Sequence, residues 1–129
     1  MKIERFEDLE VWQLSRKLVN CIYKMTNGER FSRDFGLTNQ IQRSSVSVMS
    51  NIAEGFARNN NNELIQFLRI SKGSCAEATT QLNIAYEIGY LEKEEYSDIF
   101  NQLTSLNDKL SKFINYLRAK RKNKEFINK

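Results

Sequence analysis

Apolar residues recur at steps of three and four along four long segments of this chain, which is the pattern of amphipathic helices. The last segment carries an unbroken heptad pattern. The apolar heptad positions are Tyr96, Ile99, Leu103, Leu106, Leu110, Phe113 and Leu117. The predicted helices run from about Glu7 to Thr26, from about Phe35 to Ala57, from just after Asn60 to about Ile88, and from about Glu92 to Ala119 or beyond. Short connections between them predict an all-α, antiparallel up-down-up-down four-helix bundle.

Polar residues and glycines mark the ends of the predicted helices. Asp34 is placed to cap the second helix, and Asn60 with Glu63 has the spacing of a capping box before the third. Gly28 follows the first helix, where glycine can take the left-handed conformation that ends a helix. Residues 28–34 are therefore expected to form a short loop.

The composition supports helices and removes several kinds of chemistry. The 129 residues include no proline and five glycines, which favours long helices over a turn-rich β-sandwich. Histidine is absent, which excludes His-based catalytic triads and His-containing metal sites, di-iron bundles among them. The acidic residues that open the fourth helix suit its dipole better than a metal ion. We therefore expect no enzyme activity, no metal and no cofactor.

Positive charge is concentrated at the C-terminal end. Residues 1–108 hold 12 basic and 15 acidic residues, whereas residues 109–129 hold eight basic residues and one acidic residue. We divide the chain into a bundle domain, residues 1–118, and a basic C-terminal tail, residues 119–129. The candidate nucleic-acid contacts are Arg118, Lys120, Arg121, Lys122 and Lys124. The alternative is that these cations complement a helix C-terminus and keep the chain soluble.

Four further cations are candidate contacts if the tail does not bind. They are Arg16, Lys17, Arg69 and Lys72.

Polar residues also share faces of the two middle helices. Spacing places Arg43, Ser47, Asn51 and Glu54 on one face of the second helix, and Glu77 and Gln81 one turn apart on the third. Two interpretations are open: a contact surface for a ligand or RNA, or a structural hydrogen-bond network between helices or subunits. We favour the network, because an interface built from small residues still needs its polar groups satisfied.

Several short segments occur together in a familiar order and spacing. They are Phe6–Trp12, Gly36–Gln40, Ser50–Gly55, Phe67–Ile70, Gly73-Ser74, Ala76-Glu77, Gln81-Leu82 and Gly89–Leu91. From residue 6 to about residue 118 the chain thereby resembles the bacterial 23S rRNA intervening-sequence proteins, often labelled S23 ribosomal protein. The resemblance implies a small all-α bundle that assembles as a homopentameric ring, with no established biochemical role. A similar bundle, the accessory protein of diversity-generating retroelements, engages a reverse transcriptase and nucleic acid.

Two hypotheses follow from these observations. The first is a non-catalytic homo-oligomer that associates with RNA or DNA through its basic surface and tail. Five copies of a chain with net charge +4 would carry about +20, and weak phosphate contacts would add through avidity. The alternative is a protein-interaction scaffold that recruits a partner enzyme and has no nucleic-acid role of its own.

A cytoplasmic location is expected under either hypothesis. No apolar run approaches the ~18 residues that a membrane span needs. The N-terminal residues also lack the apolar segment of a signal peptide.

Overall fold

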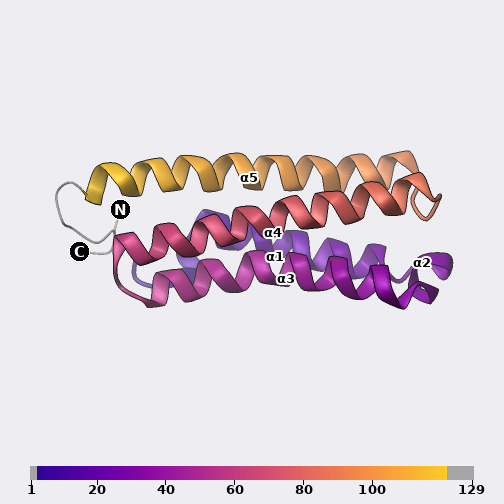
Figure 1. Cartoon of the computed structure of the whole chain (residues 1–129), viewed down its shortest axis with the longest axis horizontal. Coiled ribbons are helices and arrows are strands. Elements are labelled where there is room, and N and C mark those ends of the chain that lie inside the picture. Colours follow the sequence, from indigo (N-terminus) through magenta and orange to yellow (C-terminus); the bar gives the residue numbers. More distant parts are fainter. Residues whose placement is uncertain (1–2, 122–129) are drawn as a thin grey trace.

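The computed structural model describes residues 3–121, and this part of the chain contains helices and connections but no strand. Two short elements accompany four long helices (Figure 1). The short elements are the 3-10 helix η1 (Phe6–Asp8) and the helix α2 (Glu29–Arg33). The long helices are α1 (Glu10–Met25), α3 (Phe35–Ala57), α4 (Asn61–Glu87) and α5 (Lys93–Arg121). The predicted all-α fold is confirmed.

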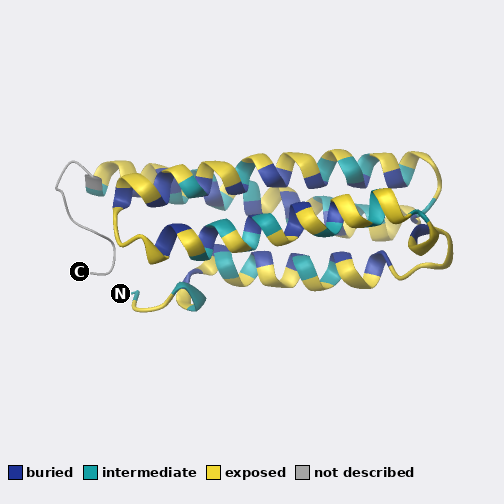
Figure 2. Cartoon of the chain, turned by 60° about the horizontal axis from the view of Figure 1, so that its bottom comes forward, coloured by how far each residue is buried: buried dark blue, intermediate teal, exposed yellow. Residues whose placement is uncertain are grey.

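The four long helices lie lengthwise beside one another around a common core. Helix α3 packs against α4, α4 packs against α5, and α1 contacts both α3 and α5. Figure 1 places α2 and the α4–α5 connection at one end, and the α3–α4 connection at the other. Buried residues line the inner side of each long helix (Figure 2). The largest fully buried side chains are Leu18, Ile22, Phe31, Ile41, Ile52, Leu64, Leu68, Leu82, Leu103, Leu106, Leu110 and Leu117.

Small residues let α3 and α4 approach closely. A Cβ atom added at Gly55 of α3 would lie 2.6 Å from the Cβ atom of Phe67 on α4, so only glycine fits there without a shift. The hydroxyl of Ser71 on α4 donates a hydrogen bond to the main-chain carbonyl of Val48 on α3 at 2.9 Å. Glycine and serine have low helix propensity, but here Gly55 and Ser71 form the close contact between α3 and α4 of the same chain.

The first helix begins later than the sequence predicts. Residues Phe6–Asp8 form a separate 3-10 turn, and α1 starts only at Glu10. Between them Leu9 is buried in an extended conformation, with φ −74° and ψ 129°. Burial of this leucine outweighs the helical continuity that the acidic residues around it suggest.

The predicted loop after the first helix contains a helix instead. Gly28 has φ −55°, so it is not left-handed, and it precedes the five-residue helix α2. Phe31 anchors α2 because its side chain is 1% exposed. Positive φ angles occur elsewhere among the described residues, at Asn59 (57°) and Gly89 (88°), which follow α3 and α4.

The bundle end that holds α2 is tied together by residues far apart in sequence. The hydroxyl of Tyr90 donates to Asp34 Oδ2 at 2.9 Å, and Arg30 donates to the main-chain carbonyl of Gly89 at 3.4 Å. The rings of Phe31 and Tyr90 lie 5.2 Å apart. The hydrogen bond to Asp34 also raises the pKa of the Tyr90 phenol. These contacts hold the connection between α1 and α3, which includes α2, against the connection between α4 and α5.

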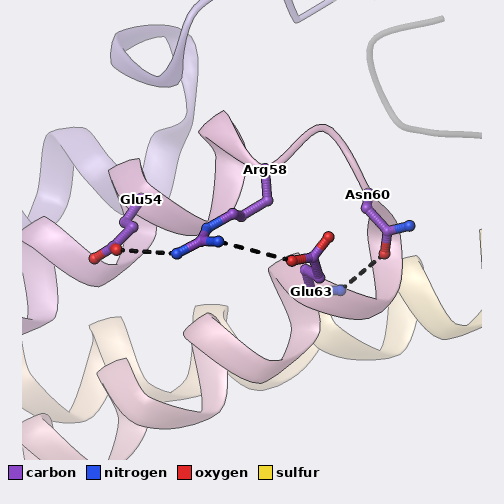
Figure 3. A network of polar contacts seen from close by, with 4 residues as sticks. All are labelled: Glu54, Arg58, Asn60 and Glu63. Atoms are coloured by element: carbon purple, nitrogen blue, oxygen red, sulfur yellow. Dashed lines mark hydrogen bonds and ion pairs between the residues drawn. The ribbon is translucent and has the colours of Figure 1, made fainter.

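The α3–α4 connection is held instead by residues close in sequence (Figure 3). Asn60 Oδ1 accepts from the main-chain N–H of Glu63 at 3.0 Å, as the predicted N-cap requires. Arg58 lies 3.3 Å from Glu54 and 4.0 Å from Glu63. These ion pairs are about half exposed, so each contributes at most ~1 kcal/mol.

Within residues 3–121, no helix combines the length and the apolar character that crossing a membrane requires.

Candidate nucleic-acid interface

The predicted contacts at the C-terminal end fall partly within α5. Arg118 is exposed and Lys120 is half-buried, and both belong to the last turns of the helix. Arg121 is the last residue of α5, whereas Lys122 and Lys124 lie outside the described residues. Helix α5 therefore runs into the segment that the sequence assigns to the tail. A nucleic-acid role for these five residues stays a prediction.

A groove between α4 and α5 brings Arg118 together with two cations of α4. Its volume is about 480 Å³, within the range of typical ligand sites. We call it the basic groove, and it is lined by Arg69, Lys72, Ser111, Ile114, Asn115 and Arg118. Three of these six side chains are cationic and none is acidic. Such a lining attracts anions.

The ammonium group of Lys72 has a fixed position in the basic groove. Lys72 Nζ donates to Ser111 Oγ at 2.6 Å, and this bond joins α4 to α5. A lysine ammonium has three donors, so one bond to Ser111 leaves two N–H groups for other acceptors. Because the side chain is held before a ligand arrives, less rotamer freedom remains to be lost on binding.

A thiol close to Lys72 does not cancel its charge. Burial raises the pKa of Cys75 to about 12, and the charge of Lys72 lowers it only in part. The thiol is therefore protonated and neutral at physiological pH. Cys75 therefore adds no negative charge beside the three cations of the basic groove.

Other basic residues are placed differently. Arg16 and Lys17 are exposed on α1 and do not line the basic groove. Lys109 of α5 forms an ion pair with Glu10 of α1 at 3.3 Å, so part of its charge is compensated within the chain. Of the four further candidate cations named from the sequence, Arg69 and Lys72 line the same groove as Arg118, whereas Arg16 and Lys17 do not.

The polar face of α3 is partly used inside the bundle. The hydroxyls of Ser47 on α3 and Ser74 on α4 lie 2.8 Å apart. The amide of Asn51 donates to the main-chain carbonyl of Ser47 at 2.8 Å and to its hydroxyl at 3.1 Å. The Gln81 side-chain amide and the Ser44 hydroxyl are 2.9 Å apart. These bonds form a network between α3 and α4, which is one of the two interpretations of this face.

The charged members of the same face point away from the core. Arg43 of α3 and Glu77 of α4 are exposed. Glu54 forms its ion pair with Arg58, the residue that directly follows α3. The hydrogen-bond network described above involves Ser47, Asn51 and Gln81, and a place in this network for the three charged residues stays a prediction.

Three lining residues of the basic groove were not singled out from the sequence. They are Ser111, Ile114 and Asn115. Ser111, Asn115 and Arg118 follow steps of four and three, so helical spacing alone places them on one face of α5. A helical wheel drawn from Arg118 would have found them.

The family model for the 23S rRNA-intervening sequence protein matches residues 7–112, most of the chain. The chain belongs to this family. A solved structure similar to this member comes from Bacteroides thetaiotaomicron and is described as a protein of unknown function from the S23 ribosomal protein family. The two chains share 27% identity with a TM-score of 0.74, over 81% of this chain and 97% of that one. No functionally curated protein matches.

Proposed function

We propose that this member of the 23S rRNA-intervening sequence protein family is a non-catalytic oligomer that associates with RNA or another nucleic acid. The observation that carries the proposal is the basic groove, in which Arg69, Lys72 and Arg118 meet without an acidic neighbour in the lining. Besides Arg118, residues 109–121 of α5 add four basic residues and no acidic one. Lys and Arg that contact phosphates supply most of the non-specific affinity for nucleic acids.

The proposal includes an up-down-up-down bundle that assembles as a homopentameric ring. The connections at alternating ends of the bundle in Figure 1 support the antiparallel order. Helix α4 supports an assembly because large apolar side chains lie on its outer surface. Ile70 and Ile84 of α4 are 51% and 43% exposed, and Ile88, which directly follows α4, is 46% exposed. A ring would also gather five copies of the basic groove, which raises the avidity for an extended polyanion.

The same apolar residues favour a second candidate function. The exposed isoleucines on α4 and at its C-terminal end also fit a partner protein, as a scaffold that recruits an enzyme would require. The two functions differ in their dependence on salt. Phosphate contacts weaken steeply as salt rises, whereas apolar contacts do not.

Fluorescence anisotropy of a labelled structured RNA tests the proposal, with the full-length protein at about 50 and 200 mM salt. If about six or more phosphate contacts form, the affinity should fall by roughly 10³-fold or more between the two conditions. An unlabelled DNA duplex as competitor then separates RNA from general nucleic-acid binding. Absence of binding at the lower salt would contradict the proposal and leave the scaffold function.

A further inference from the structure

We infer that the basic groove is the docking site for the phosphodiester backbone of RNA. This inference rests on the proposed function and deepens it, because it assigns the phosphate contacts to a groove shared by α4 and α5. The sequence alone places them first on Arg118 and the C-terminal tail, and names Arg69 and Lys72 only as contacts to consider if the tail does not bind. Arg69 and Lys72 then contribute as much as Arg118, although more than 40 residues separate them from it.

The groups that line the basic groove match the groups of an RNA strand. Arg69 and Arg118 offer guanidinium forks, which bind phosphate oxygens through two parallel hydrogen bonds. Lys72 adds a point charge that Ser111 holds in place. The side-chain amide of Asn115 can donate to and accept from a ribose 2′-hydroxyl. Cations for phosphate therefore stand beside a neutral polar group for sugar.

The lining also argues for backbone contact over base recognition. None of the six lining residues is aromatic, so the groove has no aromatic ring on which a base would stack. Contacts to phosphate and sugar position a strand without reading its sequence. We therefore expect similar affinity for unrelated RNA sequences of the same structure.

A lipid surface fits the basic groove less well. Membrane-binding surfaces place exposed apolar side chains beside their cations. The one aliphatic lining residue, Ile114, is 4% exposed and belongs to the core. The groove is thus charged and polar at its accessible surface, as an interface for a hydrophilic polyanion would be.

A charge-matched pair of double variants tests the inference. Arg69→Gln with Lys72→Gln removes one arginine and one lysine charge from the basic groove. Arg33→Gln with Lys93→Gln removes the same two charges at the opposite end of the bundle. Both control residues are exposed, and the Arg33–Glu29 ion pair is too exposed to matter for stability. Anisotropy with the same labelled RNA compares the two with the wild type.

We expect the groove variant to lose about tenfold or more in affinity at about 50 mM salt and its salt slope to fall by about two. The control variant should change much less, because it lowers the net charge without removing a contact. Equal weakening of the two variants would overturn the inference and leave the proposed function standing. Absence of RNA binding by the wild-type protein would overturn both.

A second pair of variants, each with a single substitution, replaces the first pair if the groove double variant does not fold. If circular dichroism shows that the groove double variant does not fold, Arg118→Gln is compared with Arg33→Gln, since both arginines are exposed helical residues. The Arg118 variant should lose about threefold to tenfold in affinity, and the Arg33 variant should stay near the wild type. Equal affinities for the two single variants would overturn the inference.

Discussion

Two glycines in the middle of long helices have different roles. Gly55 of α3 faces Phe67 of α4, and a Cβ atom there would come within 2.6 Å of the Cβ of Phe67. Gly73 of α4 has nothing within 4 Å of the place where its Cβ would lie. Packing therefore accounts for glycine at position 55. At position 73 packing gives no reason for glycine, so the low helix propensity of glycine is the main effect that an alanine would remove.

Alanine substitutions should separate these roles. Gly55→Ala should destabilise the protein by about 1–3 kcal/mol, because α3 and α4 must move apart. Gly73→Ala should stabilise it by up to about 1 kcal/mol through helix propensity. Urea unfolding followed by circular dichroism measures both. A Gly55→Ala protein as stable as the wild type would contradict the close packing. A loss of stability for Gly73→Ala would indicate another surface against this part of α4.

Residue-scale predictions from the sequence succeed where the interaction is local. Asp34 accepts from the main-chain N–H of Leu37 at 3.1 Å, and Asn60 caps α4, as their spacing predicts. The prediction for Gly28 is wrong because a distant contact decides it. Phe31 is buried against Tyr90, which lies 59 positions further along the chain, and this packing turns the expected loop into α2.

At the scale of elements, periodicity locates helices better than it assigns their faces. The second predicted helix coincides with α3, Phe35–Ala57. In α5 the heptad pattern places Phe113 in the core, but Ile114 is buried and Phe113 is only half-buried. A straight helix drifts about 20° per heptad from a seven-residue repeat. Over three heptads this drift is about 60°, less than the roughly 100° between neighbouring residues, so Ile114 joins the buried stripe while Leu117 keeps its heptad place.

The start of α4 should depend on its cap more than on its ion pairs. Asn60→Ala removes the acceptor for the Glu63 N–H and should cost about 1 kcal/mol. Arg58→Gln breaks two half-exposed ion pairs and should cost less. Thermal unfolding compares the two variants. A larger loss for Arg58→Gln would show that its contact with the Phe67 ring, 5.0 Å from the guanidinium, outweighs the cap.

At the scale of the whole molecule, the candidate site needs the fold to become visible. The charge count points to the C-terminal end, and Arg118 was found in that way. Nothing in the sequence pairs Arg69 and Lys72 with it, because helical spacing relates residues on one helix only. The bond from Lys72 to Ser111 joins residues 39 positions apart. Only the packing of α4 against α5 brings these cations together.

Light scattering should return a mass near 76 kDa, five times the 15.2 kDa of one chain, at micromolar concentration. If the outer surface of α4 forms the interface, Ile84→Glu should lower the mass, because a buried, unpaired carboxylate destabilises an interface. Thr104→Glu, at an exposed position on α5, is the matched control and should keep the full mass. A mass near 15 kDa for the wild type would contradict the assembly.

The two ends of the bundle differ in a way that concerns folding kinetics. The α3–α4 connection closes through contacts such as Asn60 with Glu63, whereas the opposite end requires Tyr90 to meet Asp34, 56 positions away. Short loops close at lower entropic cost and earlier. We therefore expect the α3–α4 hairpin to form the folding nucleus, with α1 and α5 docking later. Destabilising changes in the hairpin would slow folding, and those around Tyr90 would mainly speed unfolding.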